Sequence, residues 1–236
     1  IRLLANEDYA GGRPYLQEIV FRYYPDASSA YQAYVQGAVQ GISEVPTGLL
    51  PQALANEDLR IYTGRLPRIS LVLLNLNDPG VPFFKEIEVR KALMLGLNRQ
   101  AIISQMFNGQ AIVANSVILP GTWAHNESIA EIGYDPQLAA ETLKNAGYVI
   151  AGENNTTRAK EEVPLSFVLS YPDDDLHLGI AQLIANNWQA LGVNVTLEGV
   201  PPDVFVAEKL EPRSYQAALV DLNLSRTPDP DPYPFW

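Results

Sequence analysis

The chain has 236 residues, 47% of them apolar, and carries 27 acidic against 16 basic side chains, a formal net charge of −11. This length and apolar content suffice for a globular core, whereas the acidic surface would repel a phosphate backbone, so we expect no nucleic-acid partner. The absence of cysteine excludes disulfides, thiolate zinc sites and cysteine nucleophiles. No apolar run approaches the roughly 20 residues that span a bilayer.

The first third of the chain predicts four strands and two helices. One helix begins after Pro25 and Asp26, where Gly37 can close it, and a short one covers residues 47–56. The last predicted strand is apolar enough to be buried on both faces. β-branched, aromatic and apolar runs place the strands over residues 17–24, 42–46, 59–64 and 68–77.

Residues 82–103 predict two consecutive helices. Val89, Leu93 and Leu97 recur every four residues and form one apolar stripe of helical period. Asn98 ends the first helix and can cap the second through its side-chain oxygen. The pair contains no nucleophile, metal-ligand pair or phosphate loop, so we interpret it as a packing scaffold.

A long loop without helical or strand periodicity is predicted over residues 108–134. Ordered loops of this length in compact domains are often functional. Trp123 lies in it after a Pro-Gly pair and has two interpretations, a packed surface anchor or a platform for a ligand.

The second half alternates helices and strands, which predicts a mixed sheet with packed helices. Its clearest local signal is a helix that Asp135 caps, Pro136 opens and Gly147 ends. A polar, mobile excursion is expected over residues 152–162. Strands are predicted over residues 163–172, 193–200 and 215–224, and helices over residues 173–192 and 201–210.

Catalytic groups are scarce. His125 and His177 are the only imidazoles, and neither has metal or triad spacing with a partner. His177 follows three acids at a helix start, where a solvated face is expected, and helix capping explains those acids. We therefore predict no enzyme activity, catalytic residue, metal site or cofactor.

The C-terminal segment LVDLNLSRTPDPDPYPFW differs from the rest of the chain. A strand runs directly into alternating Asp and Pro with aromatic residues. Ligand crevices of α/β sheets lie where strands end, so this rigid, acidic and partly apolar segment is a candidate part of a ligand site. The alternative is a Pro-rich linker between domains.

Four colinear segments resemble one family, the extracytoplasmic solute-binding proteins of peptide, nickel and related ABC importers (family 5). One is the Arg-containing helix pair VRKALMLGLNRQAII, and another is the helix YDPQLAAETLKNAGY. The segments together span almost the whole chain in the family's order: residues 6–42, 89–103, 134–148 and 229–236.

The resemblance implies an α/β fold with a mixed sheet, one lobe of a type II periplasmic-binding-protein-like clamshell. Residues 1–236 would be the second, C-terminal lobe of a longer, two-lobed protein whose first lobe lies outside this chain. It would close about a hinge on a peptide or similar small molecule and deliver it to a membrane permease. The resemblance further implies a monomer outside the cytoplasm, in the periplasm or as a cell-surface lipoprotein. The alternative is a ligand-sensing domain of a transcriptional regulator.

Departures from the family pattern occur at four positions. Gln40, Glu88 and Asn98 are interpreted as structural drift. Arg226 stands four residues before Pro230, where peptide-binding members commonly place an acid that holds the ligand's ammonium group. A guanidinium prefers a carboxylate or phosphate. In a shifted register, Asp229 or Asp221 takes the acidic role instead.

Overall fold

The computed structural model describes residues 1–64, 66–152 and 155–224. The chain divides into two compact units, Ile1–Gly64 and Arg65–Trp236. A single lobe over residues 1–236 therefore remains a prediction, and each unit has its own architecture.

The first unit consists of short elements. Its helix α1 is capped by Asp26, whose Oδ1 accepts a hydrogen bond from the amide of Ser29 at 2.7 Å, and Gly37 beyond the helix has a φ of 73°. Both predicted helices are thus confirmed. The elements of the unit are β1 (Arg2–Leu4), β2 (Glu18–Val20), α1 (Ala27–Val35), the 3-10 turn η1 (Thr47–Leu49) and α2 (Leu50–Leu54).

Two of the predicted strands in this unit are wrong. Residues 42–46 and 59–64 have suitable side chains but form no strand. A strand requires a hydrogen-bonded neighbour, and local β propensity cannot supply one. The predicted strand over residues 17–24 shortens to β2 for the same reason, because β1 offers it only a short partner.

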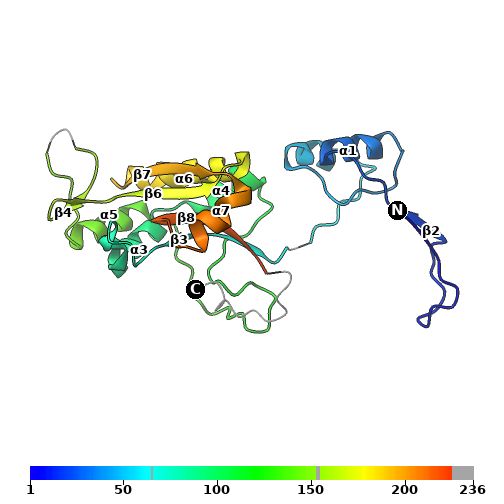
Figure 1. The fold of residues 1–236 in the computed structure, drawn as a ribbon, viewed down its shortest axis with the longest axis horizontal. Helices are drawn as coiled ribbons and strands as arrows, with labels where there is room; N and C mark the ends of the chain where they lie inside the picture. The colour runs from blue at the N-terminus through cyan, green and yellow to red at the C-terminus, as the bar shows by residue number, and fades with distance from the viewer. Residues whose placement is uncertain (65, 153–154, 225–236) are drawn as a thin grey trace. The chain divides into compact units, whose positions relative to one another are not determined.

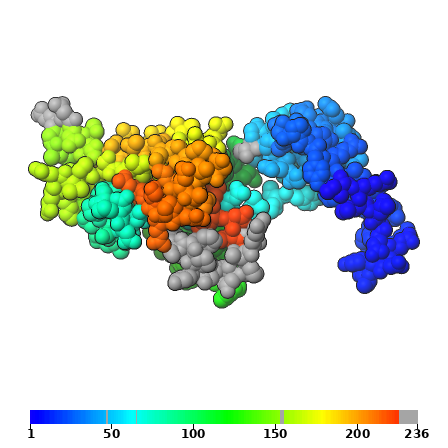
Figure 2. Space-filling view, in the orientation of Figure 1, coloured from blue at the N-terminus to red at the C-terminus, as the bar shows by residue number. Residues whose placement is uncertain are grey.

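Strands β1 and β2 form an antiparallel ribbon with two unlike faces. Leu3 pairs with Ile19, and the backbones of Ile1 and Phe21 hydrogen-bond in both directions. Side chains alternate along a strand, so one face is wholly apolar, and its residues are 42–68% exposed: Ile1, Leu3, Ile19 and Phe21. The other face carries the Arg2–Glu18 ion pair. Figure 2 draws the N-terminal part of this unit, which contains the ribbon, in dark blue.

The second unit is built on a four-stranded mixed sheet in the order β3-β8-β6-β7 (Figure 1). β6 runs parallel to both β7 and β8, whereas β3 is antiparallel to β8. The predicted mixed sheet is confirmed. The expectation that residues 68–77 are buried on both faces is wrong, because β3 lies at the edge and exposes Arg68 and Ser70. The strands are β3 (Arg68–Leu74), β6 (Ser166–Pro172), β7 (Asn194–Val200) and β8 (Ala217–Asn223).

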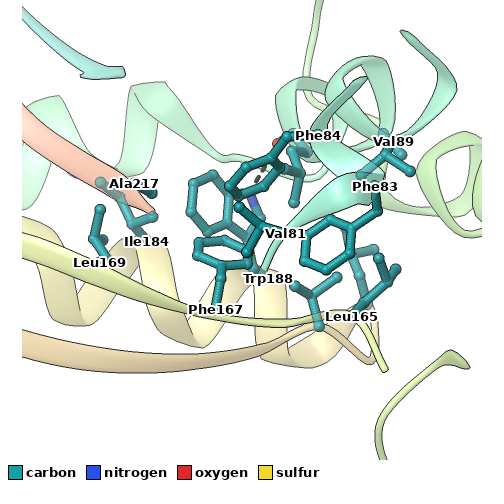
Figure 3. Packing of buried hydrophobic residues seen from close by; sticks show 14 of the residues in the cluster. Val81, Phe83, Phe84, Val89, Leu165, Phe167, Leu169, Ile184, Trp188 and Ala217 are labelled. Atoms are coloured by element: carbon teal, nitrogen blue, oxygen red, sulfur yellow. Dashed lines mark hydrogen bonds between the residues drawn. The ribbon is translucent and has the colours of Figure 1, made fainter. Parts of the chain in front are cut away.

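The main core lies between one face of this sheet and a layer of helices (Figure 1). Figure 3 shows Phe83, Phe84 and Phe167 gathered beside Trp188, with neighbouring ring centroids 4.9 to 6.4 Å apart. Such aromatic contacts add to the free energy that area burial alone supplies. The elements that cover this face are η2 (Pro82–Lys85), α3 (Ile87–Leu95), α4 (Arg99–Phe107), α5 (Pro136–Asn145) and α6 (Asp175–Ala190).

A smaller cluster covers the other face of the sheet. Helix α7 (Pro202–Phe205) and the π-helical turn η3 (Val206–Leu210) bring Phe205 and Leu210 against Ala218 and Val220 of β8. Because both faces are covered, four consecutive residues of β8, Ala217–Val220, are buried.

The predicted helix pair is confirmed as α3 and α4. Val89 and Leu93 are buried and Leu97 packs on the same core. Asn98 caps α4 by accepting a hydrogen bond from the amide of Ala101 at 2.9 Å. The pair is thus a packing element, as its single apolar stripe predicted.

Helix α5 also begins and ends as predicted. Asp135 accepts from the amide of Leu138 at 2.9 Å, and Gly147 follows the helix with a φ of 95°. The segment expected to be a mobile excursion instead contains β4 (Ala159–Lys160), which pairs with β5 (Val163–Pro164).

Candidate functional site

The candidate site is the carboxyl edge of the sheet. β6, β7 and β8 are parallel, so they end at the same edge, at Pro172, Val200 and Asn223. In open α/β sheets, ligands bind outside the carboxyl ends of the strands. β3 runs the other way and brings its first residue, Arg68, beside Asn223.

Asp221, a predicted ligand-binding residue, lies at this edge with both carboxylate oxygens occupied. Its Oδ1 accepts a hydrogen bond from the hydroxyl of Ser70, the residue opposite it on β3, and its Oδ2 lies 3.8 Å from the guanidinium of Arg68. Burial acts to raise the pKa of Asp221, but its contacts with His177, Ser70 and Arg68 outweigh burial and hold that pKa below its ordinary value. The side chain is 23% exposed, so a ligand would have to compete with these partners.

His177 is a residue of the candidate site that sequence reasoning missed. The expectation of a solvated side chain is wrong: His177 is 12% exposed, its Nδ1 lies 2.7 Å from Asp174 Oδ2, and its Nε2 lies 3.6 Å from Asp221 Oδ2. The interaction with Asp221, opposed by burial and reinforced by the hydrogen bond with Asp174, holds the pKa of His177 above its ordinary value. Only the contact with Asp174 is local in sequence, and the fold alone brings Asp221 to the imidazole.

The cluster of Ser70, Asp221, His177 and Asp174 is not arranged for nucleophilic catalysis. A serine nucleophile needs a histidine nitrogen to take its proton. Here the hydroxyl of Ser70 donates to Asp221, and both ring nitrogens of His177 face carboxylates. The arrangement can hold elements together and can titrate, but it has no base positioned to activate a nucleophile.

The long loop over residues 108–134 has no helix or strand, as predicted, and Arg99 holds it at two places. The guanidinium of Arg99, in the first turn of α4, donates to the main-chain oxygen of Ala114 at 2.9 Å and to that of Ile132. The helix pair therefore positions the loop that carries Trp123.

Trp123 is 83% exposed, which argues against its interpretation as a packed anchor. Among the residues that the structure describes, its side chain has no hydrogen-bond or ring partner. Its use as a platform for a ligand remains a prediction. Arg226 and Asp229, the other candidates, lie outside the described residues and also remain predictions.

An open depression of about 440 Å³ lies elsewhere in the second unit, between α3, α5 and β4. Its principal charged groups are already paired: Glu86 accepts hydrogen bonds from the hydroxyl of Tyr148 at 2.6 Å and from Lys160 at 2.9 Å. We therefore place the site at the carboxyl edge. Within the described part of the chain, no three His, Asp or Glu side chains are grouped to hold a metal ion.

The mixed sheet with helices packed on it has the type II periplasmic-binding-protein fold. Solved structures share the arrangement. The oligopeptide-binding protein AppA of Bacillus subtilis, in complex with a nonapeptide, matches with a TM-score of 0.71 at 26% identity, over 98% of this chain and 45% of that chain. A nickel ABC transporter from Bacillus halodurans matches with a TM-score of 0.77 at 24% identity, over 98% of this chain and 47% of that chain.

The chain belongs to the bacterial extracellular solute-binding proteins, family 5, whose middle-segment model matches residues 1–236. The sequence-based resemblance is confirmed. AppA of Bacillus subtilis is 28% identical over 233 residues, 97% of this chain and 42% of the relative. The nickel-binding periplasmic protein of Escherichia coli is 30% identical over 199 residues, 82% of this chain and 37% of the relative. The chain thus spans less than half the length of these relatives.

The family is one of extracellular solute-binding proteins, which are binding proteins and not enzymes. None of the helices in the described ranges is both long and apolar enough to cross a membrane.

Proposed function

We propose that this chain is the ligand-binding lobe of an ABC importer solute-binding protein that takes a peptide or a similar small molecule. The observation that carries the proposal is the match of the whole chain to family 5. Relatives named for peptide and for nickel binding support the class of function. No observation on the described residues favours the regulator alternative.

The proposed mechanism is closure about a hinge. The ligand would be enclosed between the carboxyl edge of this sheet and a second lobe, and its greater affinity for the closed state would drive the change. The exposed indole of Trp123, held near the main body through Arg99, offers apolar surface to such a ligand. Arg226 and Asp229 are the proposed charged contacts, with Asp221 a further candidate if the ligand displaces its partners.

The partners of the whole protein are also proposals. We infer a monomer that docks on a membrane permease, binds no nucleic acid through this segment and resides in the periplasm or at the cell surface as a lipoprotein. Support comes from the relative named as periplasmic and from the acidic net charge of −11. No turnover of the ligand is expected, including in Asp221→Asn and Asp229→Asn variants.

Ligand identification tests the proposal most directly. The full-length protein that contains this segment is purified natively, denatured, and the released small molecules are identified by mass spectrometry. A peptide with a free amino terminus would support a peptide importer and argue against Arg226 as the counterpart of the usual acid. An anionic ligand would make Arg226 the first residue to substitute. Release of no ligand, together with no binding of peptide pools or nickel complexes by calorimetry, would contradict the proposal.

The isolated chain provides a second test. Residues 1–236 alone should bind the identified ligand far more weakly than the full-length protein, because half of the contacts of a closed clamshell are missing. Binding at about micromolar affinity or tighter by this chain alone would count against closure between two lobes.

A further inference from the structure

The environment of His177 determines which of its nitrogens carry protons. Nδ1 lies 2.7 Å from Asp174 Oδ2, so a proton must lie on Nδ1, since two lone pairs at that distance would repel. Nε2 is buried, has no hydrogen-bond partner among the described residues, and has Asp221 Oδ2 as a neighbour at 3.6 Å. A neutral ring would therefore point a bare lone pair at a second carboxylate. Only the doubly protonated ring presents an N–H to both acids.

The charged groups around the ring come from three elements. The start of α6 contributes Asp174 and the exposed Asp173 and Asp175, and β8 contributes Asp221. From β3, Arg68 lies 3.8 Å from Asp221 Oδ2, the same oxygen that faces Nε2 of His177. Helix α4, which also packs on α6, brings the apolar Met106 beside Gly179. Acidic groups outnumber the single guanidinium, so the cluster favours a positive charge on the imidazole.

The position of the ring gives its protonation a mechanical consequence. Asp174 caps α6 by accepting from the amide of His177 at 2.9 Å, and Asp221 stands near the end of β8, two residues before Asn223. An imidazolium between these carboxylates attracts the start of the helix and the end of the strand toward one another. A neutral imidazole leaves Nε2 unpaired in a buried position and leaves Asp221 with Ser70 and Arg68 as its only partners.

We propose that His177 is a pH-sensitive latch at the carboxyl edge: its imidazolium ties the start of α6 to the end of β8, and loss of one proton loosens that end of the strand. His177 is thus a positioning residue for the C-terminal end of β8. The latch is a property of the residues described here and does not depend on the identity of the ligand.

Nitrogen NMR of the imidazoles tests the protonation state in the unmodified chain. The protein has two histidines, so a His125→Gln variant assigns both signals. At about pH 6, near the ordinary titration range of histidine, both ring nitrogens of His177 should have the shifts of a protonated ring. A neutral ring with a single protonated nitrogen at that pH would overturn the proposal without any further variant.

The second measurement separates a latch from a static contact. Asp221→Asn should move the titration midpoint of His177 to lower pH, whereas Asp175→Asn, which removes the same charge from an exposed position in the first turn of α6, should move it far less. Amide exchange at the end of β8, corrected for intrinsic rates, should lose protection as pH rises toward and through the midpoint, by at most about tenfold per pH unit for one proton. His177→Gln should abolish this pH dependence. Equal pH dependence in wild type and His177→Gln would overturn the latch.

Discussion

The indole nitrogen of Trp188 donates a hydrogen bond to the main-chain oxygen of Leu93 at 2.9 Å, and this buried bond joins α6 to the last turn of α3. The final carbonyl groups of a helix have no partner within the helix. Trp188 thus satisfies a polar group that the core would otherwise bury unpaired, and its ring packs on Phe167. The helix pair is attached to the rest of the lobe by this contact as well as by apolar packing.

Trp188→Phe should lower the free energy of unfolding by about 1–3 kcal/mol, because the carbonyl of Leu93 loses its partner in a buried position. Urea unfolding followed by far-UV circular dichroism measures the change. Trp123→Phe is the matched control, since Trp123 is 83% exposed, and should change stability by less than about 0.5 kcal/mol. Equal effects of the two substitutions would contradict the role of the Trp188 bond.

Arg99→Gln should release the loop over residues 108–134 while the core remains folded. The substitution removes hydrogen bonds to Ala114 and Ile132. Each bond stabilises the closed loop by about 1 kcal/mol, so the loop should open locally at least tenfold more often without them. Limited proteolysis with identification of the cleavage sites measures this opening. Lys91→Gln removes a positive charge from an exposed position of α3 and should leave the cleavage rate unchanged.

Stability should fall on the acid side as Asp221 and Asp174 become protonated. The pKa of each carboxyl is held below its ordinary value of 3.8 in the folded chain. Their stabilisation is therefore present above that value and is lost as pH falls through the lowered pKa, because the unfolded state then binds more protons. Asp221→Asn should lower the free energy of unfolding by roughly 1–3 kcal/mol near neutral pH. It should also weaken the fall in stability at acidic pH. If stability falls as steeply at acidic pH in this variant as in the wild type, Asp221 does not contribute to that fall.

The stabilisation that His177 contributes depends on pH in the opposite direction. The folded-state pKa of His177 is raised above its ordinary value of 6.5, so its stabilisation is present below that value and lost as pH rises through the folded pKa. The cluster should therefore stabilise the chain most between the two ordinary values, 3.8 and 6.5.

Ile19→Lys should reduce dye binding and self-association of the isolated chain. Ile19 lies on the apolar face of the β1–β2 ribbon, whereas its neighbour Val20 lies on the face with the Arg2–Glu18 ion pair. An uncovered apolar face on a two-stranded ribbon attracts hydrophobic dyes and other chains. Light scattering and fluorescence of a hydrophobic dye measure the effect. Val20→Lys, the matched control, should have a smaller effect, and an equal reduction by both would contradict the assignment of faces.

The elements with complete local signals could be predicted from the sequence. Asp135, Pro136 and Gly147 lie within one short segment and specify both ends of α5, and Asn98 likewise marks the start of α4. The strands at residues 42–46 and 59–64 failed because strand formation depends on a partner that the side chains of the segment do not encode.

The candidate site was less predictable than the fold. The family resemblance correctly indicated the class of protein, and Asp221 was placed at a strand end from its sequence context. His177 could not be recognised, since its exposure depends on β8, which returns beside α6 only after β7 and α7. The charged contacts proposed from the register of the last motif, Arg226 and Asp229, remain predictions.

The way in which Arg99 holds the loop has a consequence for the evolution of specificity. Both of its acceptors are main-chain oxygens, which every amino acid possesses. Substitutions at positions 114 and 132, and throughout the loop between them, leave these bonds available. Under the proposed ligand-binding role of the loop, a lineage can therefore diversify its exposed side chains, Trp123 included, and acquire new ligands while the anchorage of the loop is inherited unchanged.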